Sequence, residues 1–273
     1  MKQQVDPAGA GDTDWSFAVY FSDDPWINEN PSVSDWVQSV RDWVQFRHVL
    51  GLICCQSMPI LHPGRNPLML DPIPELEFFK DEHRYRWRGE WLAHSVSDVL
   101  DVELTPFKRA MIEKYKHGPD GWAIRGETIH EYLDGYLKGG RPPVPEKWDK
   151  WIDALLDEDF FGEAEVMATE YRVVDPLKNC AGSFDFLVRK NGLIQIGDLK
   201  TVSSKKAVAA RKPATAQLGA YSSFLARQGV YPDVAVTIVV GPEKVKVVEQ
   251  SVGTCLEAWE EAWGKFQATQ PQF

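Results

Sequence analysis

Two aspartates stand in an apolar stretch that has the pattern of a β-hairpin. Asp185 and Asp198 lie in the segment GSFDFLVRKNGLIQIGDLKT, which runs from residue 182 to residue 201. Asn191 and Gly192 divide this segment, and both tolerate the positive φ that a two-residue type I′ turn requires. Paired residue numbers across such a turn have a constant sum, which is the same for 191 and 192 as for 185 and 198. We therefore expect the two carboxylates to face each other.

Like charges in this position repel, so the sequence predicts a cation beside them. Opposed residues on one face of an antiparallel pair have Cβ atoms about 4.5–5.5 Å apart. Lys200 returns to the face of Asp198 because side chains alternate along a strand, whereas Phe184 and Phe186 point away from Asp185. The alternative is a half-solvated hairpin with ordinary exposed charges. The isoleucines before Asp198 favour a functional site, because a carboxylate among aliphatic groups is costly unless it is paired or binds a metal.

Length and composition limit the classes of protein. The chain has 273 residues, of which 44% are hydrophobic, enough for one sizeable core with a smaller appended unit. It has no run of about 18 apolar residues and no apolar signal sequence at its amino terminus, so we expect a cytoplasmic protein without a membrane span. The cysteines form no C-x-x-C pair, so we expect neither a zinc site nor an iron–sulfur cluster. They are Cys54, Cys55, Cys180 and Cys255.

Charge is distributed unevenly. The net charge of −10 argues against a nucleic-acid partner. Residues 199–232, however, contain no acidic residue, and this basic stretch begins at the aspartate pair, where a polyanion would bind. Its six cations are Lys200, Lys205, Lys206, Arg211, Lys212 and Arg227. A solvated surface is the alternative interpretation.

The pattern of elements predicts an amino-terminal extension over residues 1–75 and a main domain over 76–273. The extension would hold one helix after Ser34 and a proline-rich linker at 57–75. In the main domain we expect a hairpin at 78–92 turning at Arg88-Gly89, helices at 105–117, 122–138 and 145–161, strands at 165–174, 181–190 and 193–201, a helix at 213–228, strands at 234–240 and 244–250, and a last helix at about 253–268. The helix between the third and fourth of these strands allows a crossover, which indicates a mixed α/β core.

The order of these residues resembles a known superfamily. Asp185, then Asp198-Leu199-Lys200, in an order of helix, three strands, helix and strand, resembles the PD-(D/E)XK nucleases. The resemblance implies an α-β-β-β-α-β core with a mixed sheet flanked by helices, preceded by the amino-terminal extension.

Two further segments resemble the branch that contains RecB-like nuclease domains and related phage and CRISPR-associated exonucleases. RGETIHEYLDGYL has His130 on the helix before the sheet, and QLGAY has Gln217 and Tyr221 on the helix after the third strand. The four elements occur in order over residues 122–240.

The resemblance implies a divalent metal, Mg²⁺ or Mn²⁺, which oxygen ligands suit. Its ligands would be His130, Asp185, Asp198 and the carbonyl of Leu199. Lys200 would position or deprotonate the attacking water, Glu170 would be an outer-sphere partner, and Gln217 and Tyr221 would lie along the DNA. Further DNA contacts would come from Lys205, Lys206, Arg211 and Lys212. The alternatives are structural: a helical histidine such as His130 is usually a satisfied surface or core residue, and Tyr221 also fits an apolar stripe.

The sequence departs from many relatives in this branch, which carry four cysteines for an iron–sulfur cluster. It also lacks the G-x-x-x-x-G-K-[ST] motif of a helicase. We therefore expect a stand-alone DNA exonuclease of DNA processing, recombination or repair, or one subunit of an assembly, either as a homo-oligomer or with a recombination partner protein. It would act in the host cytoplasm if a phage encodes it. The alternatives are a restriction-type or structure-specific endonuclease, and a non-catalytic nucleic-acid-binding subunit on the same fold.

Overall fold

The structure is a computed structural model that describes residues 69–118 and 120–270. The helix expected after Ser34 and most of the expected extension lie outside these residues. The domain boundary at residue 75 therefore stays a prediction.

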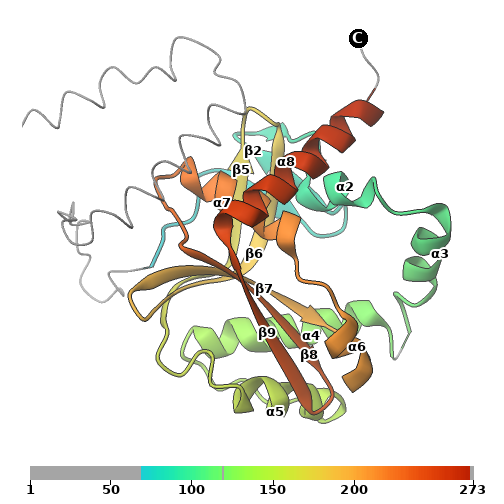
Figure 1. Cartoon of the computed structure of the whole chain (residues 1–273), viewed down its shortest axis with the longest axis vertical. Helices are drawn as coiled ribbons and strands as arrows, with labels where there is room; N and C mark the ends of the chain where they lie inside the picture. The colour runs from blue at the N-terminus through green and yellow to red at the C-terminus, as the bar shows by residue number, and fades with distance from the viewer. Residues whose placement is uncertain (1–68, 119, 271–273) are drawn as a thin grey trace, which may run out of the picture. The chain divides into compact units, whose positions relative to one another are not determined.

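A six-stranded mixed sheet forms the centre of the described part (Figure 1). Its strands are β4 (His94–Ser95), β5 (Glu165–Asp175), β6 (Cys180–Lys190), β7 (Leu193–Thr201), β8 (Val234–Gly241) and β9 (Lys244–Ser251). The order is β4-β6-β7-β8-β9, and β5 also pairs with β6. The β7–β8 and β4–β6 pairs are parallel and the other pairs are antiparallel. The five longer strands and the predicted crossover between β7 and β8 are confirmed.

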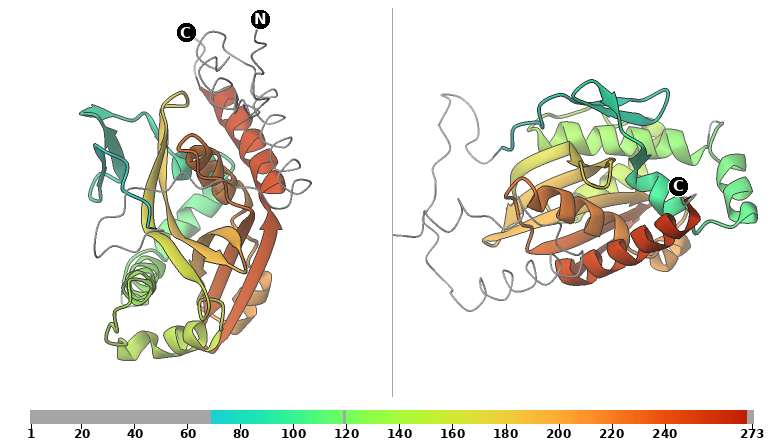
Figure 2. Two further views of the ribbon diagram at one scale, coloured as in Figure 1. Left: turned by 90° about the vertical axis from the view of Figure 1, so that its left-hand side faces the viewer. Right: turned by 90° about the horizontal axis from the view of Figure 1, so that it is seen from above.

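Helices cover both faces of this sheet. They are α2 (Val96–Asp101), α3 (Pro106–Lys114), α4 (Trp122–Leu137), the 3₁₀ turn η3 (Glu146–Trp148), α5 (Asp149–Asp157), α6 (Lys205–Ala210), α7 (Thr215–Ala226) and α8 (Val252–Thr269). Figure 2 shows α4 and α8 on opposite sides of the sheet. Ile129 of α4 and Ile152 of α5 share one buried cluster with Leu199 of β7. No helix in residues 69–118 and 120–270 is long and apolar enough to cross a lipid bilayer.

On the other face, α7 and α8 approach each other closely. A Cβ atom at Gly219 of α7 would lie 1.9 Å from the carbonyl oxygen of Cys255 in α8, so only glycine fits there. Phe224 and Trp259 pack edge to face beside this contact, with ring centroids 5.9 Å apart. The closest approach of α7 to α8 therefore depends on the glycine at position 219.

A separate three-stranded antiparallel meander precedes the central sheet. It consists of β1 (Leu76–Phe79), β2 (Arg84–Trp87) and β3 (Glu90–Trp91). The predicted turn at Arg88-Gly89 is present, with φ of 52° and 82°. Leu76 and Tyr85 bury the inner face of the meander against Ala181 of β6. The hairpin prediction was right about this turn but missed the strand β1.

Two short helices were also missed. The sequence predicted a helix over 213–228 but no helix over 205–210, where α6 lies. It likewise predicted none over 96–101, where α2 begins at a capping box: the Ser95 hydroxyl accepts from the Asp98 amide while the Asp98 carboxylate accepts from the Ser95 amide. Six-residue helices are too short to show a clear periodicity, because stability in such a segment comes from caps and tertiary packing.

One prediction about β6 was wrong. Phe184 and Phe186 were expected to lie on a single face, but they pack in different cores. The ring centroid of Phe184 lies 6.3 Å from that of Tyr221 on α7. The ring centroid of Phe186 lies 5.1 Å from that of Phe161, in the segment after α5. The strand therefore changes the helices that it faces at the intervening residue, Asp185.

Candidate metal-binding active site

The hairpin of β6 and β7 has the register that its turn predicts. Asn191 and Gly192 have φ of 52° and 78°, and five residue pairs run from Lys190–Leu193 to Phe186–Gly197. The next pair in this register would be Asp185 and Asp198, but the ladder ends before it. The register is thus confirmed, and the two strands separate where the aspartates lie.

Asp185 occupies the opening between the separating strands. Its Oδ2 accepts a hydrogen bond of 2.5 Å from the backbone N–H of Leu199. This side-chain bond satisfies an amide of β7 at the point where the β6–β7 ladder has ended. Asp185 is thus fixed by the amide of Leu199, while the expected role of the Leu199 carbonyl as a metal ligand stays a prediction.

The other neighbour of β6 is also irregular at this point. Glu170 in β5 falls between the pairs Thr169–Phe186 and Tyr171–Phe184, so it stands opposite Asp185. Its φ is 45°, in the left-handed region that non-glycine residues rarely adopt. Such a conformation costs about 1–3 kcal/mol and occurs preferentially at functional sites. Regular pairing is thus interrupted on both sides of Asp185.

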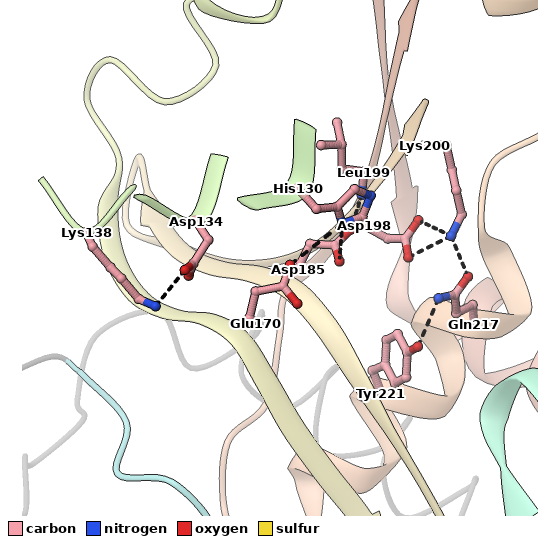
Figure 3. Close-up of polar contacts among 10 residues, drawn as sticks. All are labelled: His130, Asp134, Lys138, Glu170, Asp185, Asp198, Leu199, Lys200, Gln217 and Tyr221. Atoms are coloured by element: carbon pink, nitrogen blue, oxygen red, sulfur yellow. Dashed lines mark hydrogen bonds and ion pairs between the residues drawn. The ribbon is translucent and has the colours of Figure 1, made fainter. Parts of the chain in front are cut away.

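We call His130, Glu170 and Asp185 the donor cluster (Figure 3). His130 Nδ1 lies 3.2 Å from Asp185 Oδ1 and 3.6 Å from Glu170 Oε1. One ligand atom from each residue lies within 4.8 Å of the others. The side chains of His130 and Glu170 are 28% and 44% exposed, whereas that of Asp185 is 11% exposed. The cluster is therefore close enough to hold one cation and accessible to solvent from one side.

The electrostatics of the donor cluster favour an imidazolium in the metal-free protein. Burial alone would lower the pKa of His130, but the carboxylates of Asp185 and Glu170 raise it to about 10. Burial likewise opposes ionisation of Asp185, yet the charge and hydrogen bond of His130 lower its pKa below the usual value. In the metal-free protein, the positive charge of protonated His130 therefore balances the two carboxylates, as a metal cation would.

A second group, the lysine chain, extends from β7 to α7 and consists of Asp198, Lys200, Gln217 and Tyr221 (Figure 3). Lys200 Nζ lies 2.8 and 3.0 Å from the two carboxylate oxygens of Asp198. The same ammonium donates to Gln217 Oε1 at 2.9 Å, and Gln217 Nε2 donates to the Tyr221 hydroxyl at 2.9 Å. Gln217 and Tyr221 can make this contact because they are i and i+4 on one helix.

Asp198 is the most buried acid of the site, with 2% exposure. Burial and the charge of Asp185 raise its pKa to about 6, although Lys200 opposes the shift. Its Oδ2 lies 2.8 Å from the Lys200 ammonium but has no hydrogen bond of acceptable geometry. Asp198 is not among the three residues whose ligand atoms lie within 4.8 Å of one another, but its buried oxygen has unfilled acceptor capacity. The imidazole and carboxylates of the donor cluster, with this oxygen, fit a hard divalent cation such as Mg²⁺ or Mn²⁺.

Tyr221 packs in the core, as the apolar stripe predicted, and its expected position along the DNA stays a prediction. Its ring is 3% exposed and packs in the core, while its hydroxyl accepts from Gln217. Burial, together with the charge of Asp198, raises the pKa of Tyr221 well above its usual value. The hydroxyl therefore stays protonated and can donate a hydrogen bond of its own.

The basic stretch is not one surface. Arg227 pairs at 3.1 Å with the fully buried Asp175, and Lys205 pairs at 2.5 Å with Glu243. Three further cations are exposed on α6 and in the segment after it, namely Lys206, Arg211 and Lys212. Two of the six cations in the predicted basic stretch thus have their charge balanced by acids that lie far from them in the chain.

The sequence reasoning missed Asp134, which is one helical turn after His130 on α4. Its Oδ2 accepts from Lys138 at 2.7 Å, and its buried Oδ1 has no hydrogen bond. Figure 3 shows that this pair lies on the far side of Glu170 from the lysine chain. The spacing of four residues from His130 on a predicted helix was the signal available for it.

Comparison with known proteins gives a limited result. No protein-family model and no curated protein matches the chain. A solved structure described as a "putative exonuclease" from Eubacterium rectale is 14% identical, with a TM-score of 0.42 over 64% of this chain and 78% of that one. The solved structure of SSO0001 is 18% identical, with a TM-score of 0.36 over 65% and 76%. Both TM-scores are below 0.5, so neither similarity assigns a fold family or an activity to this chain.

Proposed function

We propose that the chain is a metal-dependent nuclease of the PD-(D/E)XK type that hydrolyses phosphodiester bonds in DNA as an exonuclease. The observation that supports it best is the meeting of the donor cluster and the lysine chain in the opening between β6 and β7. Phosphoryl transfer needs a bound cation beside a fixed positive charge, and both can be supplied there.

The cation would be held by the donor cluster of His130, Glu170 and Asp185, whose ligand atoms lie close together. Asp198, which the resemblance also implies as a ligand, lies outside that cluster and would add its buried Oδ2. When bound, a divalent cation polarises a phosphoryl oxygen and lowers the pKa of a coordinated water. His130 must release its proton for this binding, because only the neutral imidazole is a metal ligand.

Lys200 has the role of a positioned charge. Its ammonium is fixed between the Asp198 carboxylate and the Gln217 carbonyl oxygen, so it needs little reorganisation during the reaction. A preorganised cation of this kind stabilises the negative charge that develops on the phosphoryl group. Gln217 and Tyr221 act on the orientation of Lys200 through the chain of hydrogen bonds that joins them.

The polymer substrate would follow the exposed cations after β7. Lys206, Arg211 and Lys212 are exposed and can contact phosphates, which would hold DNA beside the site. A non-catalytic binding module would gain nothing from the buried pair of carboxylates, since their repulsion needs a cation. An endonuclease remains the second candidate, because the same residues would serve it.

The decisive experiment is a cleavage assay on end-labelled linear single- and double-stranded DNA and on closed circular DNA, with Mg²⁺, Mn²⁺ or EDTA. We expect cleavage of linear DNA only, abolished by EDTA and by Lys200→Ala. The matched control is Lys265→Ala, which removes an exposed lysine that is also paired with carboxylates, those of Glu103 and Glu261. Metal-dependent cleavage of the circle would favour the endonuclease, and no cleavage of any substrate by wild type would refute the proposal.

A further inference from the structure

The outer face of the β1–β3 meander combines aromatic rings and guanidinium groups. The inner face is buried by Leu76 and Tyr85, so the residues between them in the strands point outward. The cross-strand pairs Glu77–Arg86, Phe79–Arg84 and Arg86–Trp91 place five side chains together on the outer face. We call the set Phe79, Arg84, Arg86 and Trp91 the outer platform.

The rings and cations of the outer platform are in contact. The ring centroids of Phe79 and Trp91 are 4.8 Å apart, and the side chain of Trp91 remains 42% exposed. Arg84 lies over the Trp91 ring at 4.7 Å, and Arg86 lies over the Phe79 ring at 4.8 Å. Arg86 is also paired with Glu77 at 2.8 Å, which leaves one net positive charge on this face.

The meander is attached to two of the three elements that carry the donor cluster, β6 and α4. The Tyr85 hydroxyl lies 3.2 Å from Ser183 Oγ, and Ser183 precedes Asp185 by two residues on β6. Lys80, at the end of β1, forms an ion pair with Glu127, which is one helical turn before His130 on α4. These two contacts hold the meander against β6 and α4, near Asp185 and His130 in the chain.

We propose that the outer platform stacks the unpaired bases of single-stranded DNA on its way to the site. The inference rests on the proposed nuclease function and specifies the form of its substrate. Exposed aromatic faces and guanidinium planes stack on any base without regard to sequence, and adjacent cations contact the backbone phosphates. A duplex keeps its base faces stacked inside the helix, so it has no surface that matches these rings.

The test measures binding without catalysis. Anisotropy of a labelled oligothymidylate of about 12 nucleotides is recorded in EDTA, beside an abasic oligonucleotide of equal length and charge. We expect Trp91→Ala and Phe79→Ala each to weaken oligothymidylate binding by about tenfold and to leave the weaker abasic binding unchanged. Arg84→Gln should weaken the binding of both ligands, because it removes a phosphate contact.

The β1–β3 meander also contains a residue suited to a control variant. Arg88 stacks at 4.5 Å on Trp87, the same kind of contact, but in the turn and with a residue of the inner face. Arg88→Gln should therefore leave both affinities unchanged. Trp91→Leu, compared with wild type by thermal melting, separates lost stacking from lost folding, because leucine retains apolar volume but no aromatic face.

Three results would overturn the platform. The first is an affinity for oligothymidylate that Trp91→Ala and Phe79→Ala leave unchanged. The second is a loss of affinity for the abasic ligand as large as the loss for oligothymidylate. The third is an equally large loss of affinity for a duplex of the same length. Absence of oligothymidylate binding by wild type would also overturn it. The nuclease proposal is decided separately, by metal-dependent cleavage with wild type, so the two can fail independently.

Discussion

The donor cluster and the lysine chain both place a cation against a buried aspartate, but they differ in access to solvent. His130 and Glu170 are 28% and 44% exposed, whereas Asp198 is 2% exposed and Lys200 is 23% exposed. In the metal-free protein the cation of the first group is a proton, which solvent can exchange. The cation of the second group is an ammonium held by Asp198 and Gln217.

The difference in solvent access indicates a division of roles between the donor cluster and the lysine chain. A partly open cluster of acids and imidazole can replace its proton by a metal ion, because the protonated and the metal-bound forms balance the same carboxylates. An ammonium that is covalently part of the chain and held by the buried Asp198 and by Gln217 cannot be exchanged, and instead provides a constant electrostatic field. The four predictions below test this division.

Asp185 contacts both His130 and the backbone beside Lys200, so its loss should have the largest effect. We expect Asp185→Asn to reduce DNA cleavage on the order of 100-fold or more, since groups that act as a unit are lost together. Initial rates on linear DNA in Mg²⁺ provide the measurement. A variant that cleaves within a few-fold of wild type would show that the two groups are not joined through this residue.

The thermal stability of Asp198→Asn relative to wild type should depend on whether a metal ion is present. The raised pKa of Asp198, about 6, means that its ionisation destabilises the fold as pH rises through that value. At pH 8 in EDTA the variant should melt at or above wild type, since it lacks the repulsion from Asp185, on the order of 1 kcal/mol.

Saturating Mn²⁺ should reverse this order. Binding to the folded state adds about 2.7 kcal/mol for wild type at a hundredfold excess over Kd, and the variant lacks one ligand. Thermal melts with Mn²⁺ and with EDTA check both parts. If the variant melts far below wild type in EDTA, or gains as much from Mn²⁺, then the aspartates do not share a cation.

His130→Gln should reveal the exchangeable proton through pH. The pKa of His130 is raised from 6.5 to about 10, so its ion pair stabilises the metal-free fold fully below pH 6.5 and is lost as pH rises through 10. The melting temperature of wild type in EDTA should exceed that of the variant by most at about pH 6, and the difference should shrink toward pH 10. A difference that does not vary with pH would assign His130 a packing role only.

Tyr221→Phe should have the smallest effect and tests whether the lysine chain extends to α7. The hydroxyl that accepts from Gln217 is lost while the ring stays in the core. We expect about a fivefold fall in cleavage, which corresponds to one lost hydrogen bond of about 1 kcal/mol, with little change in melting temperature. Unaltered cleavage would confine the role of Tyr221 to packing.

Local signals predicted the geometry of the hairpin and not its surroundings. The register of β6 and β7 followed from Asn191-Gly192, because positive φ at both residues permits only a few turns. The separation of the strands could not be predicted, since it involves the strained Glu170 of a third strand.

The prediction of the site residues from the sequence was limited in the same way, to what local patterns can show. His130, Asp185 and Lys200 were found because each belongs to a spaced motif, and the structure brings them into the opening between β6 and β7. The ion pairs of Arg227 with Asp175 and of Lys205 with Glu243 join residues far apart in the chain. No local pattern reports such pairs, so the basic stretch seemed more uniform than it is.

The close approach of Gly219 to Cys255 also has a consequence for the order in which the site is completed during translation. The residues of the donor cluster end at Asp185, whereas one side of α7 packs closely against α8. Cys255 follows Gly219 by 36 residues, which ribosomes add in about 2–7 s at about 5–20 residues per second. During that interval the nascent chain has the carboxylates of the site but lacks the surface of α8 against which α7 packs. The arrangement of Lys200 and Gln217 that we propose for phosphodiester cleavage is therefore completed only after α8 has been synthesised.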